Sequence, residues 1–317
     1  LVHRMYLEFT AEASDGSNVN PGHTAIDNIE LEIGGQRIDR QHGHWMEAWV
    51  ELTEPNDAAL VGDASTAGSG TKFQNLAKAG GCLAHSSNPC VVPLQFWFCR
   101  NPGLALPLIA LQYHEVKVIV NWSGLVVSGA TLYADYIYLD TDERRRFAQV
   151  SHEYLIEQVQ HQAVTSNQSD ITLNFNHPVK ELVWVGVTSA STGLRTDFNG
   201  TACLLKLNGH DRFSSRSLSY FTQTQVWQHH TGTPLTQDAT SIGVGKASND
   251  EIAVYSFALK PEEHQPSGTC NFSRIDNARL ESTSAAAENT PNATKIFAVN
   301  YNVLRIMSGM GGLAYSN

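Results

Sequence analysis

Apolar and polar residues alternate along most of the chain, in short runs separated by Gly, Asn and Pro. A period of two places successive side chains on opposite faces of an extended strand, so each run predicts a β-strand. The pattern therefore indicates a mostly β protein. The runs lie at 2–9, 28–33, 91–98, 114–121, 131–139, 153–159, 171–176, 180–187, 202–207, 251–258, 270–275 and 295–306.

Two runs are followed by dipeptides that favour tight hairpin turns. Gly34-Gly35 follows "NIELEI", and Asn208-Gly209 follows "LLKL". Both dipeptides accept positive φ at two successive positions, as a type I′ turn requires. Beyond each hairpin, large apolar residues recur at intervals that predict a short helix, less clearly in the second case. These residues are Trp45, Trp49 and Leu52 after the first hairpin, and Leu218, Phe221 and Trp227 after the second.

The chain also contains an internal echo. The stretch 31–40, "LEIGGQRIDR", is similar to 205–213, "LKLNGHDRF". The two stretches are 174 residues apart. A repeat of that length is a whole domain rather than a solenoid unit, so we predict two β domains, 1–148 and 149–317, that meet near "DERRRFAQVSHEY". Antiparallel domains with many strands and long excursions, here 53–90 and 281–294, are typical of eight-stranded jelly rolls.

The apolar-rich stretch "CRNPGLALPLIALQYHEV" at 99–116 is shorter than the roughly 20 residues that span a bilayer, and Pro107 interrupts it. We predict instead a connection between a strand ending at Phe98 and a strand starting at His114. Its large apolar residues are expected to close one end of the sandwich. They are Leu104, Leu106, Leu108, Ile109 and Leu111.

Composition narrows the class of protein. The 317 residues are 42% hydrophobic and carry a formal charge of −10, with Arg144-Arg145-Arg146 as the main basic cluster. This disfavours a nucleic-acid-coating surface, which needs clustered cations to displace counterions from phosphates. Five scattered cysteines favour a reducing compartment. No signal peptide or spanning helix is evident, and the opening at Leu1 inside a strand-like run indicates a fragment or a processed chain.

One segment resembles a metal motif. In "GQRIDRQHGHWME", Gly35, His42, His44 and Glu47 approximate the first motif of cupins, which are jelly rolls that bind a metal through His and carboxylate ligands. The spacings each differ by at least one residue, and only Asn271 stands where the second motif needs another His. We therefore expect no metal here.

The other reactive residue types also give weak signals. "CLAHSSNPC" brings Cys82, His85 and Cys90 together but lacks the C-x2-C pair of a zinc site, so a Cys82–Cys90 disulfide and free thiols both stay open. His114-Glu115 and His152-Glu153 are strand neighbours that face opposite ways. "DTDERRR" is interpreted as an interdomain salt-bridge cluster. No nucleophile elbow, phosphate loop or dinucleotide fingerprint occurs, so the sequence predicts no enzyme and no cofactor.

Asparagine sequons for glycosylation recur along the chain. Those in turn-like stretches, Asn167, Asn199 and Asn292, are the expected accessible acceptors, whereas two others stand in strand-like runs. The full set is Asn121, Asn167, Asn199, Asn271 and Asn292.

Several blocks in order along the chain resemble the major capsid protein of nucleocytoplasmic large DNA viruses, most closely the chlorella virus and phycodnavirus type. They include "NIELEIGGQRIDR", "VPLQFWF", "NPGLALPLIALQYHEVKV", "DYIYLDTDERRRFAQVSHEYLIEQVQ", "LNFNHPVKELVW", "LNGHDRF", "YSFALKPEEHQPSGTCNFSRIDNARL" and "NYNVLRIMSGMGGLAYSN".

This resemblance implies a double jelly roll, two consecutive eight-stranded antiparallel β-sandwiches, with the first lacking its N-terminal strands. It implies a homotrimer that forms a pseudo-hexagonal capsomer of an icosahedral shell. The expected partners are neighbouring capsomers and minor capsid and penton proteins, with a membrane beneath the shell but no direct insertion and no direct nucleic-acid contact. The expected location is the virion, after assembly in the host cytoplasm. The family has no catalytic residues to transfer, and its capsid proteins carry glycans on outward loops.

Two other classes stay open from the residues alone. A cupin-like metalloenzyme would use His42, His44 and Glu47, and metal analysis would detect it. A jelly-roll carbohydrate-binding protein would need exposed aromatic platforms, although such residues more often fill cores. The candidate platforms are Trp45, Trp49, Trp97, Trp122, Trp184 and Trp227.

Overall fold

The computed structural model describes residues 1–12, 21–55, 71–79, 89–124, 126–164, 170–187, 195–196, 202–232, 235–236, 246–247, 252–283 and 293–315. Antiparallel sheets dominate it, as the alternating pattern predicts. Within these ranges, no helix is both long enough and apolar enough to cross a membrane.

Two three-stranded sheets are built from the first part of the chain. One has the order β4-β1-β6, and the other has the order β3-β2-β5. The predicted turn at Gly34-Gly35 joins β2 to β3, with φ values of 59° and 82°. The strands are β1 (Val2–Glu12), β2 (Ile26–Ile33), β3 (Gln36–His42), β4 (Cys90–Pro93), β5 (Val116–Trp122) and β6 (Val126–Tyr136).

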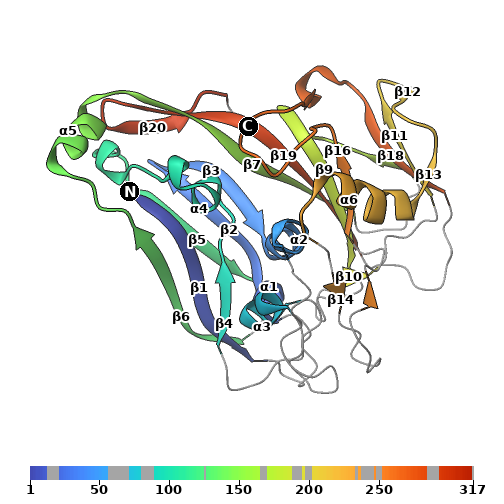
Figure 1. Cartoon of the computed structure of the whole chain (residues 1–317), viewed down its shortest axis with the longest axis horizontal. Coiled ribbons are helices and arrows are strands. Elements are labelled where there is room, and N and C mark those ends of the chain that lie inside the picture. Colours follow the sequence, from blue (N-terminus) through green and yellow to red (C-terminus); the bar gives the residue numbers. More distant parts are fainter. Residues whose placement is uncertain are drawn as a thin grey trace.

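A seven-stranded sheet forms the centre of the molecule. The long strand β19 (Ala293–Met307) pairs with β7 (His152–Val164) along one edge and with β9 (Pro178–Val187) along the other. In Figure 1, β9, β16 and β19 lie between the blue and green strands on the left and the five-stranded sheet on the right. The remaining strands are β10 (Arg195–Thr196), β16 (Ile252–Ser256), β17 (Cys270–Asn271) and β20 (Met310–Leu313).

The five-stranded sheet has the order β12-β11-β18-β8, with β13 paired to β11. Asn208-Gly209 makes the predicted turn between β11 and β12, with φ values of 52° and 80°. Strands β14 and β15, of two residues each, form a separate two-stranded sheet. The strands of the two sheets are β8 (Asp170–Thr172), β11 (Ala202–Leu207), β12 (His210–Asp211), β13 (Arg216–Ser217), β18 (Ala278–Thr283), β14 (Leu235–Thr236) and β15 (Lys246–Ala247).

Short helices cover the ends of the sheets. Both predicted helices are present: α2 carries Trp45 and Trp49, and a π-helical turn leads into α6 after the second hairpin. The helices are α1 (Pro21–Thr24), α2 (Gly43–Thr53), α3 (Lys72–Ala77), α4 (Trp97–Arg100), α5 (Thr141–Gln149) and α6 (Gln225–His229). The shorter turns are η1 (Pro102–Leu104), η2 (Leu108–Ala110), η3 (Tyr220–Thr224) and η4 (Phe272–Arg274).

The buried apolar side chains form two separate cores, one on each face of the seven-stranded sheet. The first core includes side chains of β1, β2 and β4, and the second core includes side chains of β8, β11 and β18. On β9, Val183 belongs to the first core, whereas Trp184 belongs to the second. On β19, Phe297 and Ile296 divide in the same way. Both faces of a strand that lies between two cores must be apolar, which explains the nearly continuous hydrophobic runs "LVWVGV" and "IFAV".

Several expected strand boundaries are wrong, and three of them are instructive. Strand β4 ends at Pro93, and residues 97–100 form a helix instead of completing a strand. The next strand begins at Val116 rather than at His114. In 270–275, only two residues pair as β17 before a 3-10 turn begins. Trp97, Phe98 and Phe272 are buried in these segments, but they are carried by short helical turns rather than by strands.

The interpretation of "DTDERRR" as a salt-bridge cluster is also wrong. Asp140 caps the N-terminus of α5, and Glu143 completes a capping box with it. Among the described residues of this segment, the one ion pair is Arg145–Asp142, at 4.0 Å between exposed side chains. The acidic residues therefore start a helix, where they satisfy backbone N–H groups that have no helical partner.

The connection at 99–116 is only partly buried. Leu106 and Leu111 are in the first core, but Leu108 is 38% exposed, so its expected role in closing the sandwich is wrong. A 3-10 turn, η2, points it outward. Leu111 approaches the backbone of Gly311, where a Cβ atom would lie 2.7 Å from Leu111 Cδ2.

This difference predicts unequal effects of two substitutions. Leu111→Ala should lower the free energy of unfolding by about 2–5 kcal/mol, because it leaves a cavity beside Gly311. Leu108→Ala should lower it by less than about 1 kcal/mol, because its side chain already contacts water. Urea denaturation of both variants measures the difference, and equal losses would contradict the assignment of these side chains.

Candidate functional site

The expected glycosylation sites Asn167, Asn199 and Asn292 lie outside the described residues. The structure places the other two sequon asparagines. Asn121 donates a 2.8 Å hydrogen bond to Asn28, and Asn271 accepts one of 3.1 Å from the backbone of Ser273.

The cupin-like residues do not converge on one point. His42 ends β3 and its ring packs against His161, with ring centroids 4.0 Å apart. His44, in the first turn of α2, has its Nδ1 3.0 Å from Lys295 Nζ, a cation that opposes metal binding. Glu47 is buried on α2. In the described part of the chain, no group of three or more His, Cys, Asp or Glu side chains is arranged to bind a metal.

Three of the described cysteines, Cys90, Cys99 and Cys203, are buried, and Cys270 is half-buried. Cys90, Cys99, Cys203 and Cys270 are free, and Cys82 lies outside the described residues. Burial raises the pKa of Cys90 to about 11 and the pKa of Cys99 and Cys203 to about 12. The reactive thiolate is therefore scarce at neutral pH.

The tryptophans do not form a sugar-binding platform. Trp227 is 81% exposed, but Trp45, Trp49, Trp97 and Trp184 are buried. Trp122 is half-buried against the first core. Aromatic rings with this burial stabilise cores instead of stacking on a ligand.

A buried group of ion pairs lies where α2, α4 and the seven-stranded sheet meet. Glu157 on β7 accepts from Arg100 at 2.9 Å and from Lys180 at 2.8 Å, and all three side chains are largely or fully buried. Burial alone would raise the pKa of Glu157, but Arg100 and Lys180 outweigh it and hold the pKa below its ordinary value. Arg100 also stacks over Trp49, 4.8 Å from the ring centroid.

A buried histidine extends this group of charges. His230 Nε2 lies 3.1 Å from Glu181 Oε2, and His230 Nδ1 lies 3.1 Å from Glu262 Oε1. Glu262 also accepts from the backbone N–H and the hydroxyl of Thr231, both at 2.8 Å. Burial alone would lower the pKa of His230, but the two carboxylates raise it to about 9. The group thus contains three cations and three carboxylates, which balance one another.

The raised pKa of His230 predicts a loss of stability at alkaline pH. The folded value, about 9, lies above the ordinary 6.5, so the imidazolium stabilises the fold fully below pH 6.5. This contribution, roughly 3 kcal/mol, is lost as the pH rises through 9. Urea titrations at pH 6.5 and 10 should show that loss in the wild type and a smaller loss in His230→Gln; equal losses would contradict it.

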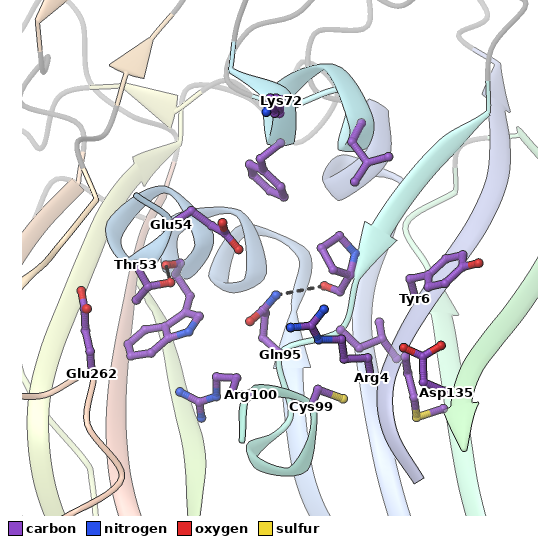
Figure 2. A pocket seen from close by; sticks show the side chains of 16 residues that line it. Arg4, Tyr6, Thr53, Glu54, Lys72, Gln95, Cys99, Arg100, Asp135 and Glu262 are labelled. Atoms are coloured by element: carbon purple, nitrogen blue, oxygen red, sulfur yellow. Dashed lines mark hydrogen bonds between the residues drawn. The ribbon is translucent and has the colours of Figure 1, made fainter. Parts of the chain in front are cut away.

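A cleft of about 820 Å³ opens beside these ion pairs. In Figure 2, Arg100 and Glu262 lie on one side, Arg4, Tyr6 and Asp135 lie on the other, and Lys72 lies above. Its rim therefore carries charges of both signs, and its only thiol is the high-pKa Cys99. These residue types form a polar cleft without an activated nucleophile or an acid–base pair.

Exposed apolar residues gather elsewhere, near the first residue and α5. A groove of about 490 Å³ is formed mainly by leucine, isoleucine and tyrosine side chains. Tyr138 is 92% exposed and Tyr136 is 59% exposed. Contiguous apolar surface of this kind marks contacts with other molecules. The groove residues are Leu1, Leu108, Ile109, Tyr136, Ile137, Tyr138, Leu139 and Arg144.

Fold and surface together define a protein built of antiparallel sheets, with buried ion pairs and an exposed apolar groove. Comparison with known proteins identifies the class. Residues 143–312 match the family model of the large eukaryotic DNA virus major capsid protein, and residues 1–130 match that of the major capsid protein N-terminus. The chain belongs to this family of major capsid proteins.

Individual relatives agree with the family models. The chain is 52% identical to a major capsid protein of Pyramimonas orientalis virus, covering all of this chain and 84% of that one. It is 37% identical to the major capsid protein of Paramecium bursaria Chlorella virus 1, covering all of this chain and 85% of the relative.

Solved structures share the fold. The PBCV-1 virus capsid model is 34% identical, with a TM-score of 0.74, and the match covers all of this chain and 90% of that one. The Faustovirus major capsid protein, 12% identical with a TM-score of 0.55, supports the fold alone; the match covers 96% of this chain and 74% of that one. The predicted double jelly roll and structural capsid role are confirmed, and the protein is not an enzyme. The cupin-like and carbohydrate-binding alternatives are not supported.

Proposed function

We propose that three copies of this chain form a pseudo-hexagonal capsomer, the repeating unit of an icosahedral shell. The observation that carries the proposal is the pair of cores on one shared sheet, which gives each subunit two β lobes. Three such subunits present six similar lobes, so they can tile a plane although only threefold symmetry relates them.

The chain is proposed to divide at 148/149 into a first and a second jelly roll. Helix α5 lies at this position, and the two family models match residues 1–130 before it and 143–312 from within it onward. The second jelly roll supplies the shared sheet, so the first core also depends on β7, β9, β16 and β19.

Neighbouring capsomers, minor capsid proteins and penton proteins are the proposed partners. The exposed apolar groove beside α5 supports such contacts, because a shell subunit must bury surface against its neighbours. The formal charge of −10 supports a shell that neither binds nucleic acid nor inserts into the membrane beneath it. Assembly in the host cytoplasm and glycosylation at Asn167, Asn199 and Asn292 are parts of the same proposal.

The mass of the protein in solution tests the capsomer. A trimer of the 34.7 kDa chain has a mass of about 104 kDa, three times that of one chain. Light scattering or native mass spectrometry should find this species. A stable monomer or dimer at every concentration would contradict the proposal.

A further inference from the structure

Two edge strands from different sheets meet along a seam, which consists of β3 and β7. Strand β3 pairs only with β2, and β7 pairs only with β19, among the described strands. Side chains join the two edges: the Val159 N–H donates to Asp39 Oδ1 at 3.0 Å, and Gln158 Nε2 donates to the carbonyl of Ile38. Because no backbone ladder crosses the seam, these side-chain contacts hold it closed.

Two histidines face each other across the seam. The rings of His42 on β3 and His161 on β7 are 4.0 Å apart between centroids. Phe297 on β19 lies against both rings, at 6.4 Å and 5.1 Å respectively. His42 Nδ1 donates to the carbonyl of Asp27 at 3.1 Å, whereas His161 Nε2 is buried and has no hydrogen-bond partner within the described residues. The contact is therefore built for two neutral rings.

The surroundings oppose protonation of these rings. Lys295 on β19 and Arg40 on β3 are the nearby cations, and Asp27 on β2 is the nearby anion. Lys295 itself contacts His44 of α2 at 3.0 Å. Two imidazolium ions in contact, beside a lysine and an arginine, would repel one another, and Asp27 is the carboxylate whose charge partly offsets this at His42.

Solvent reaches the seam. A pocket of about 240 Å³ is lined by residues of β3, of β7 and of the segment 174–176, and it includes both histidines, Asp39 and Arg37. Protons can therefore reach the rings without unfolding of either core, and a pocket already present gives the separated strands room for water.

We propose that the His42–His161 contact is an acid-operated latch: protonation of the two rings separates β3 from β7 and loosens the joint between the two sheets. This inference goes beyond the capsid role, since it gives the subunit a defined response to acidic surroundings. It does not depend on the trimer.

The net number of protons taken up on opening sets how steeply the opening constant depends on pH. Burial and nearby cations lower the pKa of His42 to about 4 and of His161 to about 3, from 6.5. Burial raises the pKa of Asp39, from 3.8 to about 6. Between pH 6 and 4, opening thus takes up about two protons at the rings and releases about one from Asp39. The net uptake of one proton makes opening about tenfold more favourable for each unit fall in pH.

Hydrogen–deuterium exchange of the peptides that contain β3 and β7, corrected for intrinsic exchange rates, measures this opening in the full chain. In the wild type the opening constant should rise about tenfold per pH unit between pH 6 and 4. His161→Phe keeps the ring stacking but removes one titrating group, so its opening constant should not change with pH. In the double variant His42→Gln/His161→Phe the constant should fall on acidification, because Asp39 alone then titrates.

The exposed His210 on β12 gives a matched control. In His210→Gln the opening constant of the seam should depend on pH as it does in the wild type. If the Phe variant does not fold, His161→Gln replaces it, with the same expected loss of pH dependence. The same pH dependence of the opening constant in the wild type and in all histidine variants would overturn the latch. So would a wild-type seam whose corrected exchange does not change with pH.

Discussion

Glu157→Gln is expected to destabilise the protein by about 3–5 kcal/mol, because it removes the carboxylate that Arg100 and Lys180 share. The two cations would stay in a site where Lys180 is fully buried, and an uncompensated buried charge is costly. Lys180 also donates to the carbonyl of Pro261, so it cannot turn toward water without breaking a second contact. Urea denaturation at pH 7 measures the loss.

Glu153 provides the matched control on the same strand. It pairs with Arg305 at 2.8 Å, but both side chains are more than half exposed. Glu153→Gln should therefore change the free energy of unfolding by less than about 1 kcal/mol. The double variant Glu157→Leu/Lys180→Met should lose less than Glu157→Gln, because neither buried charge of that pair remains. Equal effects of Glu153→Gln and Glu157→Gln would contradict the role of the buried cluster.

Trp184→Ala is the second substitution with a large expected effect, a loss of about 3–5 kcal/mol. The ring is 1% exposed, and its centroid lies 5.3 Å from that of Phe221 in the second core. Its removal leaves a large cavity on one face of the seven-stranded sheet. Trp227→Ala, which removes an 81% exposed ring, should change stability little. Thermal unfolding followed by circular dichroism measures both, and a small loss for Trp184→Ala would show that this face is not a core.

Local features of the fold could be predicted from the sequence. The hairpins at Gly34-Gly35 and Asn208-Gly209 follow from the backbone conformation that those dipeptides accept. The helix that carries Trp45 and Trp49 follows from the spacing of its apolar residues. Such features depend on residues that are close together in the chain, so their signals are intact in a single sequence.

The shared sheet could not be predicted in the same way. A run such as "LVWVGV" indicates a strand buried on both faces, but it does not say that the faces belong to two different cores. The short-range pattern failed for similar reasons at Leu108, where one turn of 3-10 helix directs a leucine into solvent. The burial of the neighbouring Leu111 depends on Gly311, which lies far along the chain and has no side chain to occupy the space that Leu111 fills.

The charged and histidine contacts were also beyond sequence reasoning. His42 was considered as a metal ligand with His44, whereas its partner in the structure is His161, which nothing in the local sequence marks. The Arg100–Glu157–Lys180 cluster joins α4, β7 and β9, and its members appear as isolated charges in otherwise apolar stretches. A charge inside a strand buried on both faces is the one signal that could have drawn attention to Glu157 and Lys180.

The buried ion pairs and the β3–β7 seam matter for the capsid role because they join the sheets of one subunit. The first core uses strands of the seven-stranded sheet, and the buried ion pairs and the seam fix how the remaining sheets meet it. A subunit with both lobes held in one arrangement can present constant surfaces to its neighbours, which a closed shell requires.

Electron microscopy of the purified protein tests the capsomer most directly. If three two-lobed subunits form the repeating unit, averaged images should show threefold particles with six lobes and a nearly hexagonal outline. Isolated two-lobed particles, or particles with twofold symmetry only, would contradict this account.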